Sequence, residues 1–246
     1  MKFTKRILTA VLATVMVFSI SACGSKSKDQ LVMATNAEFP PYEYYENQKI
    51  IGIDAEIAQA IADKLGMELV IEDMLFDSII PALLSGKADI GVAGMTITED
   101  RLESVDFSDS YVKASQAIIV KKGSDVVKSA ADLDGKTIGV QLGTTGDIYV
   151  ADVTENVERF NKGFEAVQSL AQGKLDAVVI DDQVAKALAA ENDEVEVLDE
   201  VFTEEEYAIA FKKGNDELVK KVNEALAELK ADGTLQSIID KYINAD

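Results

Sequence analysis

The stretch Ser85-Gly-Lys-Ala-Asp-Ile-Gly-Val-Ala-Gly94 returns 87 residues later as Gln172-Gly-Lys-Leu-Asp-Ala-Val-Val-Ile-Asp181. Each copy has the pattern of a helix end, a glycine turn and a buried strand. The apolar faces of the preceding helices also align: Ile79, Ile80, Leu83 and Leu84 match Ala166, Val167, Leu170 and Ala171. The repeat therefore predicts that the same αβ unit is used once in each half of the chain.

The two copies end differently, with Gly94 in one and Asp181 in the other. Open α/β sheets bind ligands beyond the carboxyl ends of their strands. If both strands end at one cleft, the first offers backbone groups and the second a carboxylate. This combination suits a small zwitterion.

The order of strand-like and helix-like segments around the repeat predicts two α/β lobes. Two crossings between the lobes form a two-stranded hinge, with the ligand cleft between the lobes. Lobe 1 is expected to comprise residues 30–115 and 209–246, and lobe 2 residues 116–208. The expected strands are 31–35, 67–71, 89–93, 118–122, 136–140, 176–180 and 207–211, and the expected helices are 53–65, 77–84, 164–171, 182–190, 216–230 and 234–242.

The first 22 residues have the features of a signal peptide: basic residues at the start, then an apolar run too short to span a membrane. Small residues precede Cys23, the only cysteine, so the segment resembles a bacterial lipoprotein signal. Cleavage would leave a lipid on the Cys23 thiol and a polar linker over residues 23–29. The alternative is an ordinary signal peptide with an incidental cysteine.

Composition excludes several functions. The net charge is −20, and it becomes −23 once residues 1–22, with three bases and no acid, are removed. Such a surface repels nucleic acid and anionic lipid, so the membrane is expected as a partner only through the lipid anchor. The chain has no histidine, which rules out Ser-His-Asp catalysis and a histidine zinc site. No nucleotide-binding motif is present, and we expect no catalytic residue, metal or cofactor.

The segment Gly94-Met-Thr-Ile-Thr-Glu-Asp-Arg101 carries the most chemistry. Gly94 lets a ligand approach the backbone, and Thr96 adds a hydroxyl. Thr98 is placed to cap a short helix that contains Arg101. The Arg101 guanidinium binds a carboxylate through two parallel hydrogen bonds. Alternatively, Arg101 is a surface residue paired with Glu103 or Asp106.

Other candidate residues also have structural alternatives. The turn Gly143-Thr-Thr-Gly146 offers free N–H groups to an anion, although such turns are common. Asp181 either accepts from an ammonium group or only caps the next helix. Phe39 and Phe76 either flank the aliphatic part of a ligand or belong to the core.

These segments together give a family resemblance that covers the chain from Leu31 to Ile243. It resembles the amino-acid-binding proteins of ABC importers, solute-binding protein family 3, with the type II periplasmic-binding-protein-like fold. The matching segments are Ala34-Thr-Asn-Ala-Glu-Phe-Pro-Pro-Tyr-Glu43, Gly52-Ile-Asp54, Ile80 to Asp89, Gly94 to Arg101, Asp106-Phe-Ser-Asp109 and Gly143 to Gly146.

The resemblance implies a role for each matched residue. Arg101 would bind the α-carboxylate, with further donors from Thr96 and the backbone at Thr145. The α-ammonium would be held by the Gly94 carbonyl, the Thr96 hydroxyl and Asp181. Phe39 and Phe76 would flank the side chain of the ligand.

Two positions depart from the family and bear on the ligand. Asn36 stands where many relatives carry Asp, and Gln141 stands where glutamine-binding relatives carry Lys. Both positions would face the ligand side chain. The nearby Glu38, Asp182 and Gln183 would favour a basic side chain, unless they simply face solvent. The expected ligand is a polar amino acid, with a weaker preference for a basic one.

The expected function is that of a monomeric, lipid-anchored receptor on the outer face of a bacterial membrane. It would pass an amino acid to an ABC permease and its ATPase. One alternative is a cyclohexadienyl dehydratase-like enzyme on the same fold, with Glu38 or Asp181 as the general acid. A second is a sensory role, in which the closed protein presents its ligand to a chemoreceptor.

Overall fold

The computed structural model describes residues 30–243. The predicted signal peptide, Cys23 and the predicted linker therefore lie outside the described residues. Within 30–243 no helix combines the length and the apolar character needed to cross a bilayer.

The first lobe is built on a five-stranded sheet. Its order is β5 (Glu68–Asp73), β1 (Gln30–Thr35), β6 (Ile90–Gly91), β13 (Ala210–Lys212) and β7 (Val105–Phe107). Strands β5, β1 and β6 are parallel, as the alternation of strands and helices predicted. The antiparallel β13 brings the chain back into this lobe from the second.

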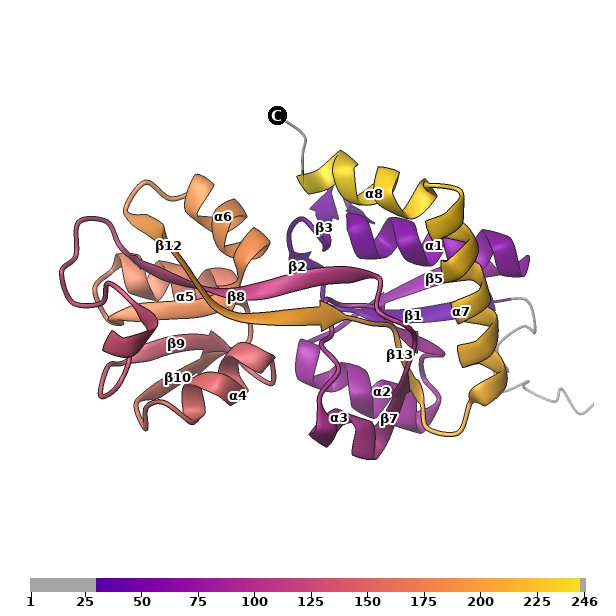
Figure 1. The fold of residues 1–246 in the computed structure, drawn as a ribbon, viewed down its shortest axis with the longest axis horizontal. Coiled ribbons are helices and arrows are strands. Elements are labelled where there is room, and N and C mark those ends of the chain that lie inside the picture. The colour runs from indigo at the N-terminus through magenta and orange to yellow at the C-terminus, as the bar shows by residue number, and fades with distance from the viewer. Residues whose placement is uncertain (1–29, 244–246) are drawn as a thin grey trace, which may run out of the picture.

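The second lobe repeats this arrangement. Its sheet has the order β10 (Val157–Phe160), β9 (Ile138–Gln141), β11 (Ala177–Asp181), β8 (Val112–Lys121) and β12 (Val195–Tyr207). Strands β10, β9 and β11 are parallel, and β8 is antiparallel to β11. The prediction of two α/β lobes is confirmed (Figure 1).

Helices cover both sheets. In the first lobe they are α1 (Ile53–Leu65), α2 (Ile79–Ser85), α3 (Glu99–Ser104), α7 (Asp216–Ala231) and α8 (Thr234–Ile243); in the second they are α4 (Thr145–Ala151), α5 (Gly163–Ala171) and α6 (Asp182–Ala190). Short 3-10 helices occupy Phe76–Ser78 and Ala130–Asp132, and a small antiparallel sheet contains β2 (Glu38–Phe39), β3 (Glu43–Glu46) and β4 (Lys49–Ile51).

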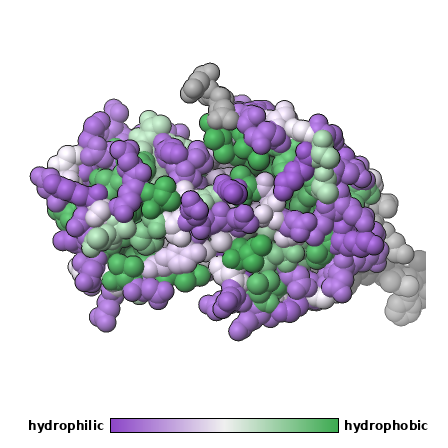
Figure 2. Space-filling model, in the orientation of Figure 1, coloured by the Kyte–Doolittle hydropathy of each residue, from purple (hydrophilic) through white to green (hydrophobic). Residues whose placement is uncertain are grey.

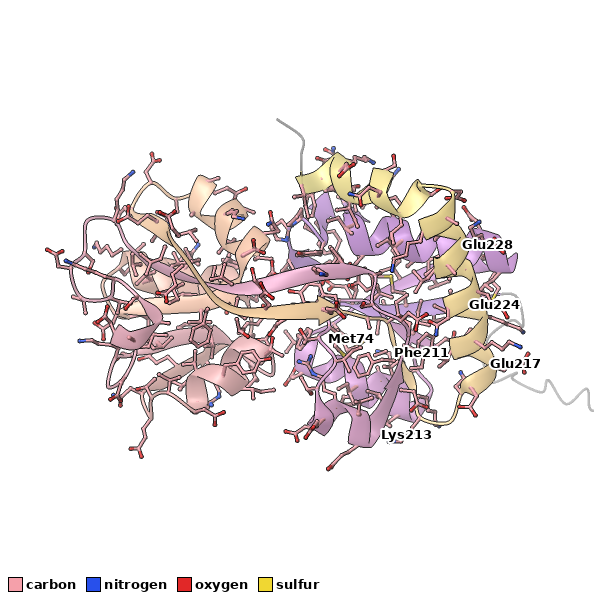
Figure 3. The ribbon with its side chains drawn as sticks, in the orientation of Figure 1. Met74, Phe211, Lys213, Glu217, Glu224 and Glu228 are labelled. Carbon is pink, nitrogen blue, oxygen red and sulfur yellow. The ribbon has the colours of Figure 1, made fainter. Side chains whose placement is uncertain are left out.

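Helix α1 shows why the apolar spacing forms these helices. Ile53, Ile57 and Ile61 recur every four residues, lie on one face and are completely buried. Gly66 ends the helix with a left-handed backbone, and its N–H bonds the last turn. Helices α1, α7 and α8 pack over one face of the first sheet. Glu217, Glu224 and Glu228 are exposed on α7 (Figure 3), and Glu228 accepts from Lys64 of α1 at 3.0 Å.

The sequence repeat is also a structural repeat. Gly86 and Gly173 both adopt the left-handed conformation after their helices, at φ 72° and 74°. Three residues later, the Asp89 carboxylate accepts a hydrogen bond from the Val32 N–H at 2.9 Å. The Asp176 carboxylate accepts from the Thr137 N–H at the same distance. Each aspartate thus connects its copy of the repeat to a neighbouring parallel strand of its own lobe, β1 in the first lobe and the start of β9 in the second.

The hinge consists of β8 and β12, which pair antiparallel and run from one lobe to the other (Figure 1). Two predicted strand ranges were wrong here. The strand expected at 118–122 is the end of β8, which begins at Val112. The strand expected at 207–211 is two strands, because β12 ends at Tyr207 and β13 begins at Ala210 in the other sheet.

Candidate functional site

Residues from both lobes line a small cavity between the sheets. Seven of the nine predicted ligand-binding residues line it: Asn36, Phe39, Phe76, Gly94, Arg101, Gln141 and Thr145. Its other lining residues are Glu43, Ala93, Gln116, Thr144 and Tyr207. The volume of about 10 Å³ is that of one water molecule. An amino acid therefore fits only after the lobes or the lining side chains move apart.

Arg101 lies in the cavity wall and is only 7% exposed. Thr98 caps its helix, since the Thr98 hydroxyl oxygen accepts from the Arg101 N–H at 3.2 Å, as predicted. The guanidinium donates to the Thr96 carbonyl at 2.7 Å and to the Gly143 carbonyl of the second lobe at 3.0 Å. It also stacks over Phe76, 5.4 Å from the ring centre. The alternative of a surface ion pair is wrong.

The turn at Gly143 faces Arg101 with a carbonyl group. The prediction of free N–H groups is wrong for Gly143 and Thr144, which donate to the Asp147 carboxylate at 3.1 Å and to the Gln141 carbonyl at 3.3 Å. Thr144 caps α4, because its hydroxyl oxygen accepts from the Asp147 N–H at 3.4 Å. Thr145 is the first residue of the helix and is buried. Thr145 and Arg101 therefore line the cavity from different lobes.

Asn36 and Gln141 meet across the two lobes. The Gln141 amide donates to the Asn36 side-chain oxygen at 2.8 Å. The Asn36 amide donates in turn to the Met74 carbonyl at 2.9 Å. Met74 lies at the end of the first lobe nearest the second (Figure 3). Asn36 and Gln141, the two residues predicted to face the ligand side chain, therefore lie together in the cavity wall.

Gly94 has φ 54°, which favours glycine. A Cβ there would lie 3.0 Å from Phe39 and 3.1 Å from Tyr207. The Gly94 N–H donates to the Asp54 carboxylate at 2.8 Å, so its carbonyl is the group left for a ligand. The positive φ and the close packing of Phe39 and Tyr207 explain the glycine at this position.

Asp181 does not line the cavity in this conformation, because Tyr207 lies between them. Its Oδ1 caps α6, accepting from the N–H groups of Gln183 at 2.9 Å and Val184 at 3.2 Å. Its Oδ2 accepts from the Tyr207 hydroxyl. The capping role is confirmed. Complete burial raises the pKa of Asp181 to about 7, against the opposing effect of these hydrogen bonds.

Thr96 likewise lies outside the small cavity and lines a larger groove of about 680 Å³. We call this the acidic groove; its residues are Thr96, Ile97, Lys113, Ala114, Ser115, Tyr149, Asp182, Gln183, Val201, Glu204, Glu205 and Glu206. The Thr96 hydroxyl donates to Glu205 at 2.8 Å. Hydrophilic residues gather over the middle of the face that carries the hinge strands (Figure 2).

Glu38 does not face the small cavity. It forms an ion pair with Lys162, which precedes α5, and so connects β2 in the first lobe to the second lobe. Like the hydrogen bonds Arg101–Gly143 and Gln141–Asn36, this ion pair is a direct contact between the lobes. The three contacts show that the conformation is closed.

Two buried acids that the sequence analysis did not select lie next to the cavity. Glu43 lines it at 1% exposure, and burial together with the Asp54 carboxyl raises the pKa of Glu43 well above its ordinary range. Burial raises the pKa of Asp54 to about 6, although Gly94 and Tyr111 donate to it. As a carboxylate, Glu43 has no donor near either oxygen. When protonated, it can donate to Asp54.

Sequence reasoning also missed Gln116, Glu205 and Tyr207. All three lie on the hinge strands, in stretches without an evident binding motif. A signal did exist in the alternation of Glu205 and Tyr207, which places both side chains on one face of a strand. Within residues 30–243 no cluster of acidic, cysteine or histidine side chains is arranged to hold a metal ion.

Comparisons with known proteins agree on one family. Residues 31–245 match the model of bacterial extracellular solute-binding proteins, family 3. The arginine-binding extracellular protein ArtP of Bacillus subtilis (strain 168) is 36% identical, and the alignment covers 98% of this chain and 99% of ArtP.

Two solved structures extend the comparison. An ancestral arginine-binding protein bound to arginine is 48% identical, with a TM-score of 0.83 over 87% of this chain and 98% of that one. The ancestral amino acid-binding protein AncCDT-1, described as a precursor of cyclohexadienyl dehydratase, is 37% identical. Its TM-score is 0.81 over 87% of this chain and 96% of that one.

Proposed function

The chain belongs to family 3 of the bacterial extracellular solute-binding proteins, and from this premise we propose that it captures a basic amino acid, arginine above all. Its general role is that of an amino-acid-binding component of an ABC transporter. Arginine-binding proteins among its relatives support the choice of ligand.

The imbalance of buried charge around the cavity is the observation that carries this proposal. Among residues 30–243, Arg101 is the only base that lines it. Four buried carboxyl groups, Glu43, Asp54, Asp181 and Glu205, lie in its wall or hydrogen-bond a residue of the wall. Burial raises the pKa of Glu43, Asp54 and Asp181 and so favours their neutral forms, and a cation bound nearby would stabilise the ionised forms. A neutral amino acid adds no net charge, whereas a basic one adds one positive charge.

The ligand contacts follow from the placement of the groups. Arg101 and the start of α4 would bind the α-carboxylate across the two lobes. The α-ammonium would lie toward Gly94, Thr96 and Asp181. The aliphatic part of the ligand would pass between Phe39 and Phe76. Asn36 and Gln141 would then exchange their mutual hydrogen bond for contacts to the ligand side chain.

Thermal unfolding with a panel of the twenty amino acids, ornithine and cystine tests the proposed ligand. A ligand at 100 times its dissociation constant stabilises the folded state by about 2.7 kcal/mol. Arginine, lysine or ornithine is expected to raise the transition temperature most. If only neutral amino acids raise it, the ligand is not basic. If none does, amino-acid binding itself is wrong.

We also propose that the protein binds its ligand without converting it. A dehydratase needs a carboxylic acid placed to protonate a leaving group. Asp181 has a raised pKa, but both of its oxygens are occupied by the α6 cap and by Tyr207. Incubation with a cyclic dienyl acid should therefore give no change in absorbance. Turnover that is lost in Asp181→Asn would establish the enzyme instead.

Anchoring through Cys23, a monomeric state and delivery to a membrane permease complete the proposal. The short segment between Cys23 and β1 would hold the binding lobes near the membrane. Replacing Cys23 by alanine should move the protein from the membrane fraction to the soluble fraction. A wild-type protein that is already soluble would refute the anchor.

A further inference from the structure

Glu205 lies inside the hinge, in a run of three glutamates on β12. Glu204 and Glu206 are exposed, whereas Glu205 is only 6% exposed. Successive side chains of a strand point to opposite faces, so Glu205 and Tyr207 share the inner face. Tyr207 donates its hydroxyl hydrogen to Asp181. The hinge strand thus presents two side chains to the ligand-binding region.

The Glu205 carboxylate holds groups from two elements. Its Oε2 accepts from the Thr96 hydroxyl of the first lobe at 2.8 Å. The same oxygen accepts from the Gln116 amide of β8 at 3.2 Å. Gln116 lines the cavity, and its amide nitrogen lies 3.5 Å from the Thr145 hydroxyl. Glu205 is therefore connected directly to Thr96 of the first lobe and, through Gln116, to the wall of the cavity.

These contacts determine how the neutral side chains orient. A carboxylate only accepts hydrogen bonds, so the Thr96 hydroxyl hydrogen must point toward Glu205. The lone pairs of that hydroxyl then remain for another donor. In the same way the Gln116 amide nitrogen turns toward Glu205. Its Oε1, which is buried, has no hydrogen-bond partner among the described residues.

We propose that Glu205 is a positioning residue that makes the Thr96 hydroxyl and the Gln116 oxygen acceptors for the α-ammonium group of the ligand. This inference rests on the proposed function of amino-acid binding. It keeps the role expected for the Thr96 hydroxyl and adds Glu205 and Gln116 to the recognition of the ammonium group. It also gives the hinge a part in recognition, since Glu205 lies on β12.

Calorimetry of L-arginine binding to Glu205→Gln tests the inference. Glutamine has nearly the same shape, but its amide can donate, so the Thr96 hydroxyl is no longer held as an acceptor. The expected loss of affinity is about 10- to 100-fold, as for a hydrogen bond to a charged group. Glu204→Gln is the matched control, because it removes the same charge from an exposed neighbour. It should change affinity less than twofold.

A double-mutant cycle with Thr96→Val distinguishes positioning from a general effect on the hinge. In the Thr96→Val background, Glu205→Gln should cost at least threefold less affinity than in the wild type. Equal costs in the two backgrounds would refute the inference, as would unchanged binding by Glu205→Gln. If Glu205→Gln does not fold, Glu205→Asp keeps the charge but withdraws the carboxylate, and it should lose about tenfold.

A second readout uses 5-guanidinopentanoate, which is arginine without its α-ammonium group. Glu205→Gln should weaken this ligand less than it weakens arginine, whereas a merely structural role would weaken both equally. If the wild type binds no arginine, the proposed ligand is wrong. The same cycle with glutamine then decides the inference, since every L-amino acid carries the α-ammonium group.

Discussion

Replacing Arg101 by alanine is expected to abolish tight binding while the protein stays folded. The guanidinium uses two donors on the carbonyls of Thr96 and Gly143, at 2.7 and 3.0 Å. Three of its five N–H groups remain for the ligand carboxylate. In Arg101→Ala this carboxylate is left buried without its partner. Such a loss costs about 2–5 kcal/mol, which is about 30-fold to several thousand-fold in affinity.

Arg101→Lys separates charge from geometry. Lysine keeps the positive charge but cannot span two carbonyls and bind a carboxylate with two parallel hydrogen bonds. We expect a smaller loss, of about 10- to 100-fold. Arg159→Ala is the control, because Arg159 pairs with Asp147 at 2.8 Å outside the cavity. It should stay within threefold of the wild type.

Isothermal titration calorimetry with L-arginine measures these differences, and circular dichroism confirms that each variant is folded. If Arg101→Ala binds within threefold of the wild type, Arg101 does not contact the ligand. If Arg101→Lys binds as well as the wild type, only the positive charge matters, and binding through two parallel hydrogen bonds is wrong.

Four further predictions concern Gly94, Asp181 and Lys162. Gly94→Ala should lower affinity at least tenfold, since its Cβ would lie 3.0 Å from Phe39 where the backbone φ is 54°; unchanged calorimetry would contradict this. Asp181, with a pKa of about 7 when folded, binds a proton that the unfolded chain loses near pH 4, so the free protein should become less stable from about pH 4 to 7. The ammonium group of the ligand favours the ionised form of Asp181, so Asp181 should release a proton when arginine binds. The affinity for arginine should therefore rise from about pH 5 to 7. Calorimetry in buffers of different ionisation enthalpy detects the released proton. Lys162→Met, which removes the ion pair with Glu38 between the lobes, should weaken binding only about two- to fivefold, because the pair is partly exposed; a loss above 50-fold would show a direct role in the site.

The repeat made the two-lobed fold predictable from the sequence. A helix, a glycine turn and an aspartate are local features, and their recurrence around Asp89 and Asp176 indicated equivalent units. The structure shows why they recur, since each aspartate accepts a main-chain N–H in its own lobe. The capped helix that carries Arg101 was predictable for a similar reason, because the Thr98 cap is a local feature of the sequence.

The hinge side of the site was not predictable in this way. Glu205 contacts Thr96, which is 109 residues away in the sequence. The strand that carries it is rich in glutamate, and such a stretch is usually a solvated surface. The role of Asp181 was ambiguous because the same side chain caps α6 and accepts a hydrogen bond from Tyr207. Long-range packing decides which of these residues face the cavity.

The most direct test of the proposed function compares L-arginine with L-citrulline by calorimetry. Citrulline has nearly the same size and the same α-amino and α-carboxyl groups, but its side chain is neutral. The surplus of buried carboxyl groups around Arg101 predicts that arginine binds at least tenfold more tightly. Equal affinities, or tighter binding of citrulline, would contradict recognition of a basic amino acid.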